Sequence, residues 1–176
     1  MPYIKQEDRP KFQEDLQSIY ERIDGLVANH VEDLECVTKI ASIIVDRWFN
    51  HKPSYQTIND ICGVFNCVFL EYERRNGFNE LIPSAEVFFP SDDPEVKHML
   101  RDLEEPVESL ANKLEENDYS VGEVNYVLST ILEITTHVEP LPISDVGSVI
   151  NHIVIRFYEN KATPYELKKI EENGDI

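Results

Sequence analysis

Two stretches of this chain, separated by 85 residues, repeat one pattern. DICGVFNCVFLEYERR occupies residues 60–75 and DVGSVINHIVIRFYEN occupies residues 145–160. In both stretches apolar side chains recur at i, i+3, i+4, i+7, i+8 and i+11, the spacing that places them along one face of an α-helix. Asp60 and Asp145 each precede the first apolar residue, where a side-chain oxygen can accept from an unpaired backbone N–H. The repeat predicts the same amphipathic helix twice, with these two aspartates as N-caps.

The similarity continues upstream of both stretches. Residues 34–44 align with residues 122–132, and residues 12–26 share apolar positions with residues 103–117. Apolar residues at helical spacing dominate these segments as well. Each half of the chain therefore reads as three helices, which we expect at residues 8–28, 33–49, 59–76, 94–117, 121–137 and 144–161.

These helices predict an all-α fold in which two tandem three-helix units form a pseudo-dimeric helical bundle. The first unit is residues 1–80, a linker follows at residues 81–93, and the second unit, with a C-terminal arm, is residues 94–176. A unit of about 80 residues buries little surface alone, so pairing two apolar faces around a two-fold axis would stabilise both units. We expect the protein to be a monomeric pseudo-dimer or a homodimer.

Acidic residues outnumber basic ones by 34 to 16, and the excess is uneven. Residues 1–85 carry 14 acidic and 9 basic groups, net −5, whereas residues 86–176 carry 20 and 7, net −13. We expect no direct binding of nucleic acid, because neutralising its phosphates needs the opposite charge. The acidic surface has two interpretations: a solvated face that keeps the protein soluble, or a face that imitates a nucleic-acid backbone. Its residues are Asp102, Glu104, Glu105, Glu108, Glu115, Glu116 and Asp118.

The cysteines and histidines predict no disulfide framework and no zinc site. Cys36, Cys62 and Cys67 form no CxxC pair, and the five histidines are scattered along the chain. This usage fits the cytoplasm. Since no run of about 18 apolar residues is present, we expect no membrane span. We also expect no cofactor, no metal and no catalytic residue, because the sequence contains no P-loop, GxGxxG, HExxH or GxSxG pattern.

Three short segments resemble a family of small, uncharacterised bacterial and phage proteins. They are the PYI-type start at residues 1–4, the GEVNYV-type helix that begins at Gly122, and the KIEENGD-type C-terminal tail at residues 169–175. The resemblance implies relatives of about half this length with one helical unit, so this chain looks like a duplicated version. It implies no particular activity.

Two residue pairs are candidate sites. Asn66 and Asn151 occupy the same column of the repeat, where a buried or interfacial pair would fix the register of two units; the alternative is a pair of boundary residues that bond solvent. Tyr126 and Tyr158 would line a groove between the halves that accepts a small ligand such as a nucleotide. Ordinary packing is the alternative for these tyrosines.

We expect a non-enzymatic cytoplasmic binding or assembly protein, encoded by a phage or prophage, that acts by contact with a protein partner. One alternative is an acidic DNA-mimic inhibitor of a nucleic-acid-handling protein. The other is a helical hydrolase or sequestering protein for a small nucleotide, since Glu104, Glu105 and Glu108 have a spacing with which helices hold a magnesium ion.

Overall fold

The computed structural model describes residues 4–76, 90–136 and 141–174, and every regular element within them is helical. The fold is therefore all-α, as the sequence predicts. The α-helices are α1 (Pro10–Ala28), α2 (Asp33–His51), α3 (Tyr55–Asn76), α4 (Pro94–Met99), α5 (Glu104–Glu115), α6 (Val121–Thr135), α7 (Ile143–Phe157) and α8 (Thr163–Asn173). Shorter 3-10 or π segments are η1 (Gln6–Asp8), η2 (Leu100–Leu103) and η3 (Tyr158–Ala162).

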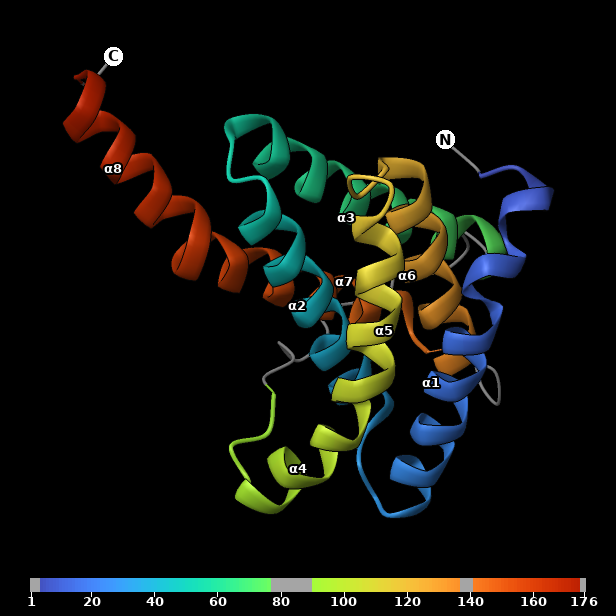
Figure 1. The fold of residues 1–176 in the computed structure, drawn as a ribbon. Helices are drawn as coiled ribbons and strands as arrows, with labels where there is room; N and C mark the ends of the chain where they lie inside the picture. The colour runs from blue at the N-terminus through green and yellow to red at the C-terminus, as the bar shows by residue number, and fades with distance from the viewer. Residues whose placement is uncertain (1–3, 77–89, 137–140, 175–176) are drawn as a thin grey trace.

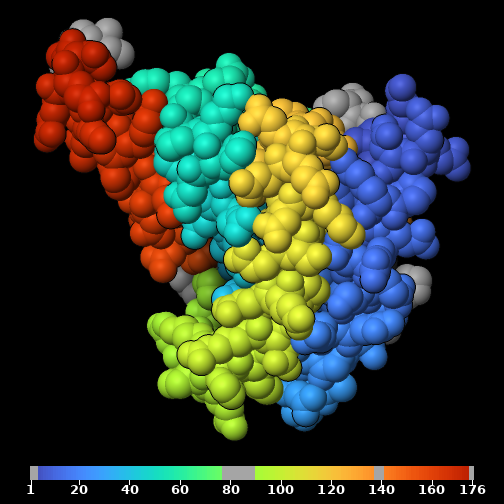
Figure 2. Space-filling model, in the orientation of Figure 1, coloured from blue at the N-terminus to red at the C-terminus, as the bar shows by residue number. Residues whose placement is uncertain are grey.

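The two halves of the chain interlock in one compact bundle. α2 of the first half packs against α5 and α7, and α6 of the second half packs against α1 and α3. The contacts of α2 with its own neighbours α1 and α3 are less extensive. In Figures 1 and 2, α5 (yellow-green) lies between α2 and α1 of the first half. Each middle helix is therefore buried mainly by helices of the other half.

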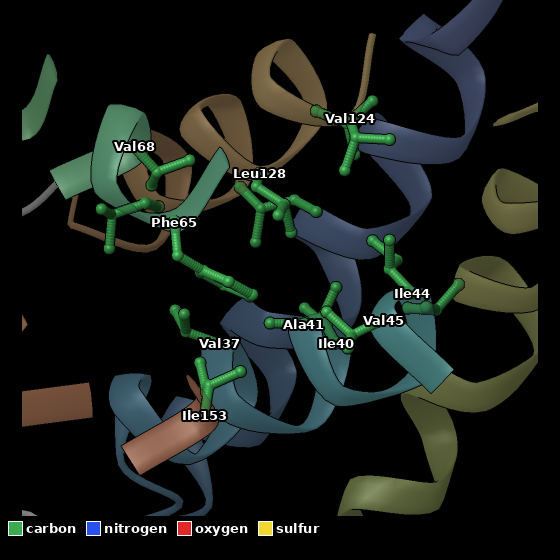
Figure 3. Packing of buried hydrophobic residues seen from close by; sticks show 14 of the residues in the cluster. Val37, Ile40, Ala41, Ile44, Val45, Phe65, Val68, Val124, Leu128 and Ile153 are labelled. Carbon is green, nitrogen blue, oxygen red and sulfur yellow. The ribbon is translucent and has the colours of Figure 1, made fainter. Parts of the chain in front are cut away.

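One hydrophobic core runs through both halves. Apolar side chains of α2, α3, α6 and α7 converge on the interior in Figure 3. Ile40 of α2 and Ile131 of α6 are 0 % and 1 % exposed. Burying a side chain of this size contributes about 1.5–3 kcal/mol. Because residues from both halves fill the same interior, neither half encloses a core of its own.

The predicted N-cap at Asp60 is wrong. α3 begins at Tyr55, so Asp60 lies in its second turn. The cap is Ser54, whose Oγ accepts from the backbone N–H of Thr57 at 3.0 Å. The apolar stripe marks where the helix becomes buried, whereas the helix itself starts one turn earlier at a residue that can satisfy the free N–H groups.

Asp145 is likewise not an N-cap. α7 begins at Ile143, directly after Pro142, so Asp145 is the third helical residue. Its carboxylate accepts from the hydroxyl of Ser144 at 3.2 Å. A negative charge in the first turn still interacts favourably with the partial positive charge of the helix N-terminus.

The helix predicted over residues 94–117 is divided into α4, η2 and α5. Its predicted start is confirmed, because Asp93 caps α4 by accepting from the backbone N–H of Glu95 at 2.8 Å. The division follows from Pro106, which has no N–H to donate to the carbonyl one turn earlier. That carbonyl, of Asp102, accepts from Arg22 of α1 at 2.9 Å instead.

The chain leaves the bundle after α7. The π segment η3 leads into α8, which projects from the body in Figure 1 and contains no buried residue. Tyr165 anchors it by edge-to-face contacts, with ring centroids 5.8 Å from Phe49 and 5.5 Å from Tyr55. The C-terminal arm expected from the sequence is thus a helix over Thr163–Asn173. The predicted linker at residues 81–93 lies largely outside the described residues.

Candidate functional site

The acidic residues of α5 face basic residues of α2. Glu104 accepts from the ammonium of Lys39 at 2.7 Å. Arg47 bridges two acidic residues, donating to Glu108 at 2.8 Å and to Glu115 at 2.9 Å. The partner ammonium of Lys39 holds the pKa of Glu104 below its usual range. We call these contacts and those of the next paragraph the ion-pair seam, because they join the two halves along α5.

The ion-pair seam extends to both ends of α5. At one end Arg22 of α1 lies 3.5 Å from Glu105 and donates to the carbonyl of Asp102. At the other end Lys52 donates to Asp118 at 2.8 Å, and this contact lowers the pKa of the Asp118 carboxyl. The acidic excess of the second half therefore meets the basic residues of the first. Of the seven residues predicted as an acidic surface, five carboxylates are paired in this way, and Glu116 is exposed.

The two tyrosines predicted to share a groove lie in separate places. Tyr126 of α6 packs on Phe12 of α1, with ring centroids 6.2 Å apart, and the guanidinium of Arg9 lies 5.4 Å from the centre of its ring. Tyr158 follows α7, is 37 % exposed and contacts Phe157 edge to face. The two clefts of the described residues that Tyr126 lines do not include Tyr158. A ligand groove around Tyr158 stays a prediction, whereas Tyr126 does line a cleft.

The two recurring asparagines lie at the surface. Both Asn66 and Asn151 are exposed, and the Asn66 amide donates to the carbonyl of Cys62 in its own helix at 3.0 Å. Neither side chain is buried between the halves. A role in fixing the register of two units stays a prediction.

A polar cleft between α3 and α6 brings together residues that the sequence analysis did not select. It has a volume of about 340 Å³ and continues into a second hollow of about 230 Å³ that shares four of its residues. The N-terminal end of α1 contributes Arg9 to its edge. We call this the Asn125 cleft; its lining residues are Arg9, Glu71, Arg75, Asn125, Tyr126, Ser129, Thr130 and Glu133.

One side of the Asn125 cleft is a buried carboxylate between two arginines. Glu71 is only 2 % exposed. Arg74 donates to it twice, at 2.9 and 2.6 Å, and Arg75 donates at 2.7 Å. Arg75 also donates to Glu133 across the cleft. Burying a carboxylate is costly unless it is paired, and here two guanidinium groups compensate its charge. The Glu71 carboxylate in turn raises the pKa of Arg75.

The inner end of the Asn125 cleft carries two polar side chains with unused bonding capacity. Asn125 is 3 % exposed. Neither its Oδ1 nor the Oγ of Ser129 has a hydrogen-bond partner among the groups that the structure describes. A buried polar group without a partner costs about 1–3 kcal/mol, so such groups are uncommon and mark places where a ligand can bind.

The sequence does contain a signal for these two residues. In the alignment of residues 34–44 with residues 122–132, Asn125 meets Val37 and Ser129 meets Ala41. Both counterparts are buried among apolar side chains, as Figure 3 shows. Packing of the core does not explain a polar residue at a position that is apolar in the other copy of the repeat. The polar residues that recur in both copies, Asn66 and Asn151, lie at the surface instead.

A second cleft, of about 440 Å³, lies between α2 and α7, the counterparts of α6 and α3. It is lined by basic side chains that already have partners. Lys97 donates to Asp92 at 2.8 Å, and Lys161 lies 3.6 Å from Asp46. This cleft therefore has the same place in the repeat as the Asn125 cleft but a different chemistry.

The chain matches the model of one protein family. The family model described as "Domain of unknown function (DUF6899)" matches residues 1–79 and 96–176. The chain belongs to this family. The resemblance to an uncharacterised family is thereby confirmed, and the two matched segments of this family correspond to the two halves that interlock in the bundle. No curated protein and no solved structure matches the chain.

Two kinds of feature are absent from the described residues. No helix there is long and apolar enough to cross a membrane. Nor do three or more His, Cys, Asp or Glu side chains of this part of the chain gather where they could hold a metal ion.

Proposed function

We propose that this chain is a non-enzymatic binding and assembly protein of the cytoplasm that acts by contact with a protein partner through α8. The observation that carries this proposal is the exposure of α8. Leu167 is 56 % exposed and Ile170 is 38 % exposed, on a helix of 11 residues without a buried side chain. A helix this short is only marginally stable in water unless a neighbour covers its apolar face.

The pattern of α8 suits insertion into an apolar groove of another protein. Pro164, Leu167 and Ile170 follow one another at i, i+3 and i+6, which places them on one side of the helix. The opposite side holds Tyr165, which anchors α8 to Phe49 and Tyr55. Recognition of a helix by a groove uses such an apolar stripe as its anchors. The side of α8 that carries Tyr165 is therefore fixed to the bundle, and the exposed apolar side with Leu167 and Ile170 is available to a protein partner.

Two features support the remaining parts of the proposal. Cys36, Cys62 and Cys67 are all free thiols, as in proteins of a reducing compartment. The family model matches two segments, residues 1–79 and 96–176, and this division of the match supports a duplicated version of a single-unit relative. We further propose that a phage or prophage encodes it.

The acidic DNA-mimic alternative has less support. A mimic must present carboxylates to a basic partner, whereas Glu104, Glu105, Glu108, Glu115 and Asp118 are paired within the protein. Binding such a partner would first break the ion-pair seam.

Photo-crosslinking in cells of the source organism tests the role of α8. A crosslinking amino acid at Leu167 should capture a defined protein, and the same residue at the exposed Glu116 is the control. The double variant Leu167→Glu/Ile170→Glu should abolish co-purification of that protein without changing the melting temperature, since both side chains are exposed. Equal capture from both positions, or co-purification that the double variant leaves intact, would contradict the proposal. Capture of a second copy of the chain alone would show a homodimer instead.

A further inference from the structure

We infer that the Asn125 cleft binds a small zwitterion that carries an ammonium and a carboxylate group, the chemical class of the free amino acids. The first reason is the hydrogen-bond inventory of its inner end. Asn125 Oδ1 and Ser129 Oγ are buried and without a described partner. An amide oxygen only accepts, and a hydroxyl accepts as well as donates. A group rich in N–H donors, such as an ammonium, satisfies both.

The second reason is the comparison between the halves. The counterparts of Asn125 and Ser129 are Val37 and Ala41, which are 8 % and 2 % exposed. The corresponding helix of the first half, α2, therefore packs with apolar side chains at these positions. Because the fold does not require polar groups there, a ligand is the better explanation for a buried asparagine that lacks a partner.

The third reason is the charge of the lining. Arg9 and Arg75 carry two positive charges, and Glu71 and Glu133 carry two negative ones. A ligand without net charge enters this lining without leaving an uncompensated charge. Arg9 is held at the edge over the ring of Tyr126, where its guanidinium can bind a carboxylate in a two-pronged contact. The ammonium then lies at Asn125 and the carboxylate at Arg9.

The size of the cleft fits this class of ligand. Pockets for small molecules have volumes of about 300–1,000 Å³, and the Asn125 cleft has about 340 Å³. The cleft is also separate from the surface of α8, since no residue of α8 lines it. The zwitterion site therefore does not depend on the proposed protein contact.

Calorimetric titration of the full chain with each of the twenty common amino acids tests the inference. Adenosine monophosphate serves as an anionic probe and spermidine as a cationic one. We expect one or a few of the amino acids to bind with one-to-one stoichiometry and to raise the melting temperature. No binding of any amino acid, or tighter binding of either charged probe, would overturn the inference.

Variants that install the residues of the first half show whether binding occurs in this cleft. Asn125→Val and Ser129→Ala should each weaken binding at least tenfold, the order expected for one lost bond to a charged group. The unliganded variants should melt at or above the temperature of the unchanged protein, because a buried acceptor without a partner has been removed. A lower melting temperature would mean that Asn125 has an internal structural role and would count against a ligand site.

Two exposed positions complete the test. Arg9→Ala lies at the edge of the cleft and should weaken binding at least tenfold without affecting folding. Asn66→Ala, on the exposed face of α3, is the matched control and should bind as the unchanged protein does. Binding that survives both Arg9→Ala and Asn125→Val would place the amino acid elsewhere and refute the site.

Discussion

Glu35 and Glu123 occupy the same position in the two halves, each as the third residue of its helix, but their carboxylates have different partners. Both are buried, at 6 % and 7 % exposure. Glu35 accepts from the backbone N–H of Ser91. Glu123 accepts from the ammonium of Lys11 and from the Asn117 amide, the latter at 3.0 and 3.1 Å. One repeated residue is thus mainly desolvated, whereas the other is paired with a cation.

Neutralising Glu35 should stabilise the protein at neutral pH. Burial raises the pKa of the Glu35 carboxyl above its ordinary value of 4.5. A carboxyl whose pKa is higher in the folded than in the unfolded state lowers stability as pH rises through that interval. Glu35→Gln should therefore melt at a higher temperature than the unchanged protein at pH 7, and the difference should shrink below about pH 4, where both states are protonated. Thermal unfolding followed by circular dichroism from pH 3.5 to 7.5 measures this.

Neutralising Glu123 should have the opposite effect and provides the matched control. Glu123→Gln removes the charge that pairs with Lys11 between the two halves. The loss is about 1 kcal/mol at pH 7, because Lys11 is partly exposed and can regain water. A shift of the melting temperature in the same direction for both variants would show that pairing with Lys11 does not distinguish the two carboxylates.

The halves of the chain should not fold separately. α2 is buried by α5 and α7, and α6 is buried by α1 and α3, so each half alone would expose the faces that the other covers. Expressed alone, residues 1–85 and residues 86–176 should each lack a cooperative thermal transition. Mixed in equal amounts they should regain helical circular dichroism as a one-to-one complex. Two monomeric and independently stable halves would contradict the interlocked core.

The ion-pair seam also stabilises the association of the two halves, and its contribution depends on salt concentration. Arg47 bonds Glu108, Glu115 and the Asn112 amide, all of α5. Arg47→Met keeps much of the aliphatic length and should cost about 1 kcal/mol at low salt, less in 1 M sodium chloride, since partly exposed pairs are screened. Arg101→Met, on the exposed face of η2, is the control and should change the unfolding free energy little. An equal loss for Arg47→Met at both salt concentrations would indicate lost packing rather than lost charge.

Helical periodicity predicts the helices well because the buried stripe is a repeated local signal. Ile61 and Val146, the first apolar residues of the two repeated stretches, are 0 % and 1 % exposed. The N-caps predicted at Asp60 and Asp145 were wrong because the apolar residues show only where a helix becomes buried. They give no information on the exposed residues with which the helix begins. The pairing of Arg47 with Glu108 joins residues 61 positions apart, and no local pattern encodes which helices meet. The Asn125 cleft as a whole was not predicted for the same reason, because Glu71 and Asn125 come from different halves. The repeat marks Asn125 and Ser129 as polar residues at apolar positions, but it does not show that Glu71 lies beside them.

Replacing two helical glycines by larger residues should change the stability of the protein in opposite directions. A Cβ on Gly63 would meet no atom within 4 Å, whereas one on Gly147 would lie 3.2 Å from the ring of Phe69. Gly63→Ala should stabilise the protein by about 0.5–1 kcal/mol, because alanine loses less backbone entropy in a helix. Gly147→Val should destabilise it by about 1–3 kcal/mol by forcing α7 away from α3. Urea unfolding measures both. Equal stabilisation by the two substitutions would show that α3 and α7 do not approach closely at Phe69.

The three thiols should differ in reactivity in the order Cys67, Cys62, Cys36. Cys36 is fully buried, and burial raises its pKa to about 12. Since the thiolate is the reactive form, only about one Cys36 in 10⁴ is ionised at pH 8. Burial also raises the pKa of Cys62, but that side chain and Cys67 are only half-buried.

Labelling with a coloured disulfide reagent at pH 8 follows this order directly. The variant Cys62→Ser/Cys67→Ser retains Cys36 alone and should stay unlabelled until urea unfolds the protein, so its labelling rate reports opening of the core around α2. The complementary variant Cys36→Ala should label at both remaining sites without denaturant. Native labelling of Cys36 as fast as that of Cys67 would mean that α2 is not enclosed by the second half, and it would contradict the interlocked arrangement from which the other predictions derive.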